Sequence, residues 1–453
     1  MIQPSCALRT LAVPEILINI FECLLHDAAS MRAAICVAKH WFTCGTDVLW
    51  RRAPCEALAA LPQARRQVYA SKITSLAFSG DEESEYHALF RNLELSSLRE
   101  VSIDAYHPES GGLQLRQYLQ PPLESFAFYG GDLDDSLLQR LQTTCWRLKR
   151  ILIDSPGSTI TASSFLEFVS GCKHLEQIDL LHGVHHLLND DLLVHLAQRP
   201  NLVSLGVGKE WTPQLIHHIS TIISRPFPSL RTLDVAISSE TVPSLVSLIG
   251  GVTKLGLDVK DGQGDVISPI ATLQGLRRLD LSFGAPKELS RDEILALKNL
   301  SRLEDLIIGP TDSDDAGNVT AFNTGFSNKD FDELVSSLRL LRHLNFMIQC
   351  DLSYAVVLSL AKHCPLLEEC TMPQVLDFEG FRSEAKDGVV LPKLQVLDLG
   401  GVRPIGQDEP QTSPEELISL MRSWFPRLQE MYVSSDDDFS EVVASAFTVG
   451  EDS

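Results

Sequence analysis

One short pattern recurs fourteen times along this chain and limits its fold more than any other feature. The pattern is an aliphatic residue, two variable residues, a second aliphatic residue, one variable residue and a third aliphatic residue. Its clearest copies start at Leu175, Leu230, Leu276, Leu303 and Leu394, and weaker copies start at Ile73, Leu98, Leu123, Leu148, Leu202, Val252, Leu341, Leu367 and Leu428. Such regular recurrence predicts an array of similar structural units.

Most copies start 22 to 28 residues apart, which is the period of leucine-rich repeats. The last three residues of each copy alternate apolar, variable, apolar, as in a short strand with one buried face. Helical apolar spacing occurs between several copies, at Asp191–Gln198, Pro213–Ser224, Asp292–Asn299, Phe331–Leu338 and Ser353–His363. A single strand and helix cannot bury their apolar faces alone, so neighbours must stack. We therefore predict an α/β leucine-rich-repeat solenoid, a horseshoe of about fourteen repeats over residues 73–435, with strands on its concave side.

Charge is distributed unevenly along the chain, whose formal net charge is −22. Residues 1–72 contain eight Lys/Arg and five Asp/Glu, whereas residues 73–453 contain thirty and fifty-five. An acidic repeat array repels phosphate backbones, so we expect no nucleic-acid partner. A basic protein is a plausible partner, and acidity kept for solubility is an equally good interpretation.

The composition also predicts the cellular compartment. The first apolar stretch, Leu11 to Leu25, is interrupted by Pro14, Glu15, Asn19 and Glu22, unlike the apolar core of a secretory signal. No apolar run reaches the roughly 18 to 20 residues that cross a bilayer. The ten cysteines are scattered and form no C-x-x-C pair, which does not indicate a disulfide scaffold. We expect a cytoplasmic or nuclear protein with no membrane partner.

The first fifty residues predict a small helical module. Pro14 and Glu15 suit a helix N-terminus, and Ile16, Ile20 and Leu24 then form an apolar stripe. A second helix from Met31 precedes three further apolar positions, Val37, Trp41 and Trp50. So small a module has little core of its own, so its large apolar side chains are expected to contact a partner.

The order P-E-I-x3-I-F-x2-L, V-x3-W and L-W resembles an F-box, in the version found in fungal F-box proteins with leucine-rich repeats. Residues 1–52 would be the F-box and residues 53–72, with a helix around Leu61–Ala70, the connecting segment. Cys145, Cys172 and Cys364 resemble the cysteine of the repeat subtype in these proteins. One feature departs from the family pattern, because the asparagine that usually follows each strand is absent. Its positions are occupied by Gly183, Glu210, Ser238, Gly284 and Val402. The resemblance implies a Skp-family linker protein, and through it a cullin ligase, as partner of Pro14, Glu15, Ile16, Ile20, Leu24, Val37, Trp41 and Trp50.

No pattern of catalytic or cofactor-binding residues was found. The chain lacks G-x-x-x-x-G-K-[ST], G-x-S-x-G and H-E-x-x-H motifs. His182, His185, His186 and His195 lie close in sequence, but no carboxylate or cysteine completes a zinc-binding spacing. We therefore expect no enzyme activity, no cofactor and no metal.

Strand alternation predicts which residues face a target. The third and fifth residues of each copy, and the one after it, point to the concave face. Eleven of these are acidic and three basic, and the central candidates are Asp179, Asp234, Asp258, Asp280, Asp305 and Asp398. Two longer repeats add segments at Gly309–Asn328 and Gly400–Ser413, which are either recognition loops or tolerated insertions. Residues 436–453 form an acidic tail whose apolar spacing from Phe439 to Phe447 predicts a helix that closes the array.

The resemblance to F-box proteins implies an adaptor that holds a target protein for ubiquitination without catalytic residues of its own. A different interpretation is a repeat scaffold or inhibitor outside any ubiquitin ligase, in which the N-terminal helices only cap the array. Binding to a Skp-family protein distinguishes the two.

Overall fold

A computed structural model of the chain describes residues 11, 13–79, 84–106, 115–312, 318–384, 388–402, 413–435 and 437–447. The chain divides into two compact units, Met1–His195 and Leu196–Ser453. This division falls inside the predicted repeat array, so the predicted boundaries near residues 52 and 72 stay predictions. Each unit is described by itself.

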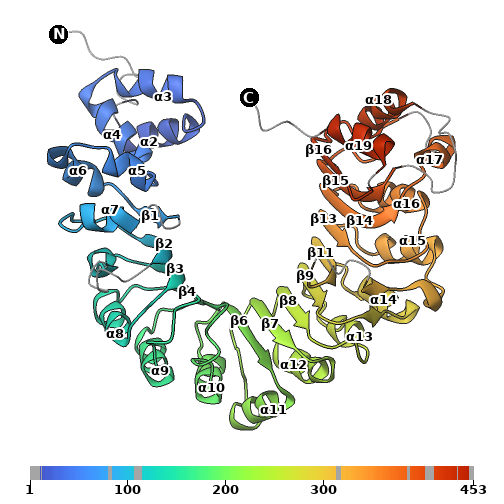
Figure 1. Ribbon diagram of the computed structural model, residues 1–453, viewed down its shortest axis with the longest axis horizontal. Helices are drawn as coiled ribbons and strands as arrows, with labels where there is room; N and C mark the ends of the chain where they lie inside the picture. The colour runs from blue at the N-terminus through green and yellow to red at the C-terminus, as the bar shows by residue number, and fades with distance from the viewer. Residues whose placement is uncertain are drawn as a thin grey trace. The chain divides into compact units, whose positions relative to one another are not determined.

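Unit 1 begins with helices and continues as strand-and-helix repeats (Figure 1). Its helices are α2 (Pro14–Cys23), α3 (Ala28–Ile35), α4 (Lys39–Leu49), α5 (Cys55–Ala59), α6 (Gln63–Ala70), α7 (Ser84–Leu89), η3 (Leu115–Tyr118), α8 (Asp135–Thr144), α9 (Ala162–Gly171) and α10 (Asp190–Gln198), which runs past the division. Its strands are β1 (Ser75–Phe78), β2 (Glu100–Tyr106), β3 (Ser125–Gly131), β4 (Arg150–Asp154) and β5 (Gln177–Leu180).

Unit 2 consists of repeats and a C-terminal helix. Its strands are β6 (Ser204–Trp211), β7 (Thr232–Ile237), β8 (Lys254–Val259), β9 (Arg278–Phe283), β10 (Lys287–Glu288), β11 (Asp305–Pro310), β12 (Val319–Thr320), β13 (His343–Phe346), β14 (Glu369–Val375), β15 (Val396–Gly401) and β16 (Glu430–Val433). Its helices are α11 (Pro213–Ile222), η4 (Ser239–Thr241), α12 (Val242–Leu248), α13 (Ile267–Ile270), α14 (Arg291–Ala296), η5 (Leu297–Asn299), η7 (Phe322–Thr324), α15 (Asn328–Ser336), α16 (Ala355–His363), α17 (Phe378–Glu384), α18 (Pro414–Trp424) and α19 (Asp438–Ser445).

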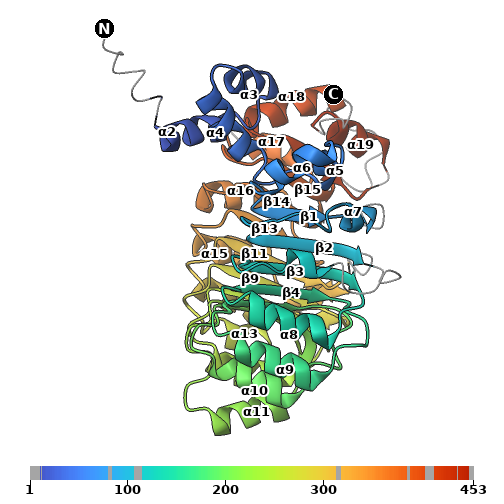
Figure 2. The ribbon, with the colours of Figure 1, turned by 90° about the vertical axis from the view of Figure 1, so that its left-hand side faces the viewer.

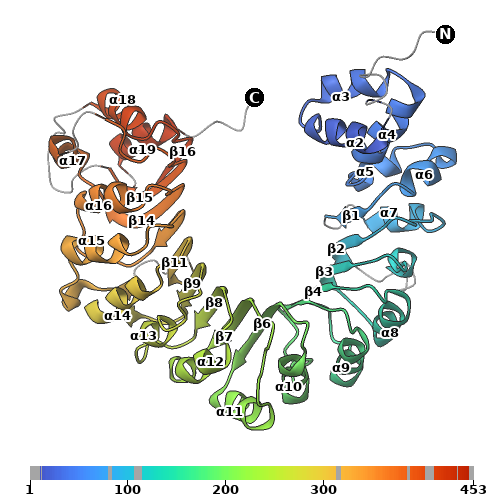
Figure 3. The ribbon, with the colours of Figure 1, turned by 180° about the vertical axis from the view of Figure 1, so that it is seen from behind.

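Each of the fourteen predicted copies forms one strand, and the strands of each unit pair in parallel in chain order. The register places the same repeat position side by side, as in Leu233↔Leu255 and Leu255↔Leu279. These leucines are buried between the strands and the helices. In unit 1 the helices α8 and α9 follow one another along one side (Figure 2), and in unit 2 helices α13 to α16 lie opposite strands β8 to β14 (Figure 3). The α/β leucine-rich-repeat fold is therefore confirmed.

The backbone after several strands is hydrogen-bonded although the usual asparagine is missing. The amide of Gly284 donates to the carbonyl of Val259 at 2.8 Å, and the amide of Lys260 donates to Ile237 at 3.0 Å. At the last such position, Val402 donates to the hydroxyl of Ser440 on α19 at 3.1 Å. Contacts between neighbouring repeats thus satisfy the buried polar groups that an asparagine would otherwise serve.

The three cysteines that resemble the repeat subtype are buried. Burial raises the pKa of the Cys145 and Cys364 thiols to about 12. A thiol with so high a pKa is protonated at neutral pH and unreactive. These cysteines therefore act as small core residues.

A carboxylate bridges two repeats in unit 2. Asp330, at the start of α15, accepts hydrogen bonds from Arg291 Nε at 2.9 Å and Nη2 at 2.6 Å, across from α14. It also accepts from the amide and the hydroxyl of Ser327 at 3.0 and 2.6 Å. The same side chain therefore caps one helix and ties it to its neighbour.

The structure describes part of the two long repeat segments and the predicted C-terminal helix. The Gly309–Asn328 segment, for which the sequence predicts a recognition loop or a tolerated insertion, is partly packed into the fold, because Val319 and Phe326 are buried and β12 pairs with β10. Residues 313–317 and 403–412 lie outside the described residues, so the second long segment stays a prediction. A helix forms near the C-terminus, where α19 buries Val443 and Phe447.

Candidate protein-interaction surfaces

The helical module, α2 to α4, has a core of five buried residues, Leu17, Phe21, Met31, Cys44 and Val48. The helix α2 begins where Pro14 fixes the first turn, with Glu15 beside it. Leu17 and Phe21 are one turn apart, so a single helix face turns inward. The predicted stripe of Ile16, Ile20 and Leu24 is only half-buried and lies beside this core face.

Two predicted partner residues, the tryptophans, already have contacts within unit 1. The Trp41 ring meets Phe21 edge-on, with centroids 5.9 Å apart, and Trp50 stacks on Tyr69 of α6 at 4.4 Å. Both rings are half-buried. Substituting either one would therefore change the module's packing as well as any partner contact.

The surface of the module carries exposed apolar side chains. Val37, in the turn between α3 and α4, is 63% exposed, and Pro14 and Glu15 are also exposed. Four further large residues are exposed in this module and were not predicted as contacts: Val13, Leu25, Phe42 and Leu49. Sequence spacing could not find them, because Leu25 and Leu49 follow the same helical pattern as core residues.

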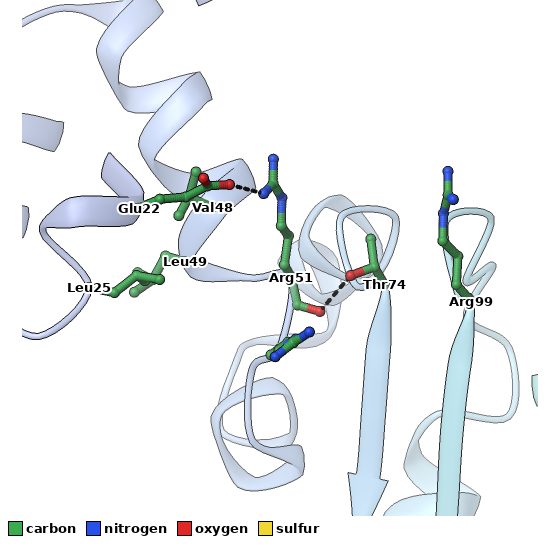
Figure 4. Close-up of a pocket in the computed structure, with 8 residues that line it drawn as sticks. Glu22, Leu25, Val48, Leu49, Arg51, Thr74 and Arg99 are labelled. Carbon is green, nitrogen blue, oxygen red and sulfur yellow. Dashed lines mark hydrogen bonds and ion pairs between the residues drawn. The ribbon is translucent and has the colours of Figure 1, made fainter. Parts of the chain in front are cut away.

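A pocket of about 680 Å³ lies within unit 1 beside the module (Figure 4). Its apolar side consists of Leu25, in the turn after α2, and of Val48 and Leu49 at the end of α4. Its polar side consists of Glu22 from α2, Arg51 and Arg52 from the segment after α4, and Thr74 and Arg99, which directly precede the strands β1 and β2. No feature of the sequence pointed to this pocket, since its residues come from four separate segments.

In unit 2, three predicted target residues lie on adjacent strands: Asp234 on β7, Asp258 on β8 and Asp280 on β9. Between Asp234 and Asp280, the register places Gly256. A β-carbon on Gly256 would lie 3.0 Å from Asp234 Oδ1, so the glycine leaves the space that this carboxylate occupies. Desolvation raises the pKa of Asp234 in this position, and the negative charges of Asp280 and Asp258 raise it further.

The other carboxylates of this face have polar partners. Asp258 pairs with Lys260 and accepts a hydrogen bond from Thr311 at 3.0 Å. Asp280 lies 3.4 Å from Arg278, and Asp305, on β11, pairs with His343. Part of the acidity predicted from the sequence is therefore neutralised within the strand face.

The remaining two predicted target residues are separate from this cluster. Asp398 lies on β15, beyond β13 and β14 in the strand order, and burial raises its pKa. Asp179 lies on β5 of unit 1. The cluster that unit 2 brings together thus consists of Asp234, Asp258 and Asp280, with Asp305 on the next strand.

Two structural findings bear on other kinds of site. Within the described part of the chain, no three His, Cys, Asp or Glu side chains are grouped so that they could hold a metal ion. His182, considered above, pairs with Asp154 at 3.2 Å. None of the helices in the described ranges is long and apolar enough to cross a membrane.

Comparisons with known proteins found similar folds at low identity. No family model matches the chain, and no curated protein matches it. A crystal structure of the Rad7 and Elc1 complex from yeast matches with 16% identity and a TM-score of 0.45, over 99% of this chain and 97% of that one. An internalin from Listeria monocytogenes matches with 15% identity and a TM-score of 0.34, over 65% and 87% of the two chains.

A third similar structure is a leucine-rich-repeat protein of Leptospira interrogans, with 16% identity and a TM-score of 0.37, over 79% of this chain and 82% of that one. Identities this low give no basis for transferring a function. The strand register and the buried repeat positions described above establish the class of fold: this chain is a leucine-rich-repeat protein with an N-terminal helical module.

Proposed function

We propose that this chain is a non-catalytic substrate-recognition adaptor of a Skp-cullin-F-box ubiquitin ligase. The observation that carries the proposal is the exposed apolar surface of the helical module. Val13, Val37 and Phe42 are all at least 38% exposed in a module whose hydrophobic core cluster consists of five buried residues. Exposed large apolar side chains on so small a module favour a surface that a protein partner covers.

The partner of this surface is a Skp-family linker protein, as the F-box resemblance implies. Pro14, Glu15 and Val37 are exposed and would contact the linker directly. Ile16, Ile20 and Leu24 are half-buried and would lose further exposed area on binding. Burial of apolar area is the main favourable term in association. The linker would connect the chain to a cullin ligase in the cytoplasm or nucleus.

The repeats would hold the target protein. The strand face of unit 2 presents Asp234, Asp258 and Asp280 together, and the pKa of Asp234 is raised first by desolvation and then by the repulsion of the other two charges. A basic segment of a target would relieve that repulsion, because a cation close to several carboxylates favours their charged form. The same carboxylates would repel a phosphate backbone, so a basic protein segment fits this face better than nucleic acid.

The test is reconstitution with the full chain. Purified full-length protein is mixed with a purified Skp-family linker, and the mixture is analysed by size-exclusion chromatography with light scattering. We expect a complex of one copy of each, which then co-elutes with a cullin. If the full chain does not bind the linker, the ligase proposal is wrong, and a scaffold acting outside any ligase becomes the better interpretation.

A further inference from the structure

We propose that the pocket of unit 1, between the helical module and the first two repeats, is a second protein-binding site that takes an acidic peptide segment carrying an aliphatic side chain. This goes beyond the adaptor function, because neither the linker surface nor the acidic strand face of unit 2 accounts for it. The pocket is defined by Glu22, Leu25, Val48, Leu49, Arg51, Arg52, Thr74 and Arg99.

The apolar side of the pocket is suited to an aliphatic side chain. Val48 is 4% exposed and belongs to the module core, so it forms a fixed base. Leu25 and Leu49 are each close to half exposed, and both line the pocket (Figure 4). A leucine or isoleucine placed between them would remove apolar area on both sides from water, worth roughly 25 cal/mol per Å².

The polar side of the pocket is basic. It contains three arginines and one glutamate, in a chain whose net charge is −22. Arg51 pairs with Glu22 at 2.5 Å, and Arg99 reaches Glu124 at 3.3 Å with a side chain that is 61% exposed. None of the described carboxylates pairs with Arg52, which is exposed. Guanidinium groups bind carboxylates through paired hydrogen bonds, so Arg52 and Arg99 are suited to an acidic ligand.

The backbone that carries these arginines is held firmly. The carbonyl of Arg51 accepts hydrogen bonds from the amides of Thr74 and Ser75, both at 3.0 Å. The amide of Arg99 donates to the carbonyl of Thr74 at 2.8 Å, and its carbonyl accepts from Glu124 at 2.7 Å. The hydroxyl of Thr74 also donates to the carbonyl of Arg51 at 3.2 Å, which is the bond drawn between these two residues in Figure 4. A pre-formed backbone reduces the ordering cost of binding.

Charge and size together select the ligand class. Basic side chains favour acidic groups and repel basic segments of the kind proposed for the strand face of unit 2. A volume of about 680 Å³ lies within the usual range for ligand sites, roughly 300 to 1,000 Å³. The pocket therefore fits a few residues of peptide, with one aliphatic side chain on the leucines and neighbouring carboxylates on the arginines.

The experiment uses a phage library of random twelve-residue peptides selected on immobilised full-length protein. The enriched sequence is then synthesised with a fluorescein label, and its affinity is measured by anisotropy. We expect enrichment of Asp and Glu next to Leu, Ile or Val. The double variant Arg52→Glu, Arg99→Glu should weaken binding of this peptide at least tenfold. The matched control is Arg65→Glu, Arg140→Glu, which reverses two exposed arginines on α6 and α8 of the same unit.

Three outcomes overturn the inference. They are an enriched sequence without acidic residues, equal loss of binding in both double variants, and no loss in the pocket variant. Circular dichroism of each variant, together with binding of the Skp-family linker, checks that the fold is intact. If the peptide binds through Arg52 and Arg99 while the wild-type chain does not bind the linker, only the proposed ligase function fails.

Discussion

The substitution Val37→Asp tests the linker surface without disturbing the module. Val37 lies in the turn between α3 and α4 and is 63% exposed. The amide of Val37 donates a hydrogen bond to the carbonyl of Ala34 at 3.2 Å, and this bond does not depend on the side chain. By contrast, Trp41→Ala would also remove the ring contact with Phe21 and would mix folding with binding.

The expected loss follows from the exposed area. Burying a whole valine side chain stabilises by about 1.5 kcal/mol or slightly more. Since 63% of Val37 is still exposed, covering it contributes about 1 kcal/mol to linker binding. A carboxylate buried there without a partner adds at least ~1 kcal/mol of desolvation cost. The sum, about 2 kcal/mol, corresponds to roughly thirtyfold weaker binding.

Isothermal titration calorimetry with a purified Skp-family linker measures this change. The matched control is Val68→Asp on α6, where the wild-type side chain is 57% exposed and was not assigned to the linker surface. Linker affinity should be unchanged in the control. Equal affinities of the Val37 and Val68 variants for the linker would refute the assignment of this turn to the partner surface.

Three further predictions concern unit 2. Asp330→Ala removes four hydrogen bonds and should lower the free energy of unfolding, measured by urea titration, by about 2 kcal/mol. The loss should be smaller than for a fully buried pair because Arg291 is 43% exposed. Burial alone would raise the pKa of Asp330, but hydrogen bonds from Arg291 and Ser327 outweigh it and lower the pKa below the ordinary value of 3.8. The ionised carboxylate therefore stabilises the fold fully above pH 3.8, and this stabilisation is lost as pH falls through the folded-state pKa. The difference in stability between the wild-type and alanine proteins should shrink on acidification. Val443→Asp on α19 should lower the melting temperature by several degrees, whereas Val442→Asp, at an exposed position, should leave it nearly unchanged; equal effects would mean that α19 does not pack as described. Salt above the physiological range, where the screening length is about 8 Å, should reduce recovery of a basic target, as measured by mass spectrometry of co-purified proteins. Substituting Asp234, Asp280 and Asp305 by lysine should reduce this recovery as well, while binding of the linker is retained.

The positions of the strands were predictable from the sequence alone. A copy such as Leu230 to Val235 contains three apolar residues at fixed offsets, and only a short strand entered through a turn buries all three. Because every repeat contacts only its neighbours, the same local rule holds along each unit. The helices between strands followed from their apolar spacing in the same way, as at Asp191–Gln198, observed as Asp190–Gln198.

The choice of buried face in the helical module was decided only by the tertiary structure. In α2 the sequence offers two apolar stripes one residue apart, Ile16 with Ile20 and Leu17 with Phe21. The ring of Trp41 on α4 packs on Phe21, and the second stripe is fully buried while the first is half-buried. Helical periodicity cannot choose between adjacent stripes, because the choice depends on where the neighbouring helix packs.

The chemistry of the surfaces also depended on the tertiary structure. The sequence predicted an acidic strand face, but spacing could not show that Lys260 neutralises Asp258 or that Gly256 leaves room for Asp234. The basic pocket was hidden for the same reason, since Arg52 and Arg99 are forty-seven positions apart in the chain. Backbone periodicity is a local property that a sequence displays directly. The environment of a charge depends on side chains brought together from distant segments, and only the folded chain determines which these are.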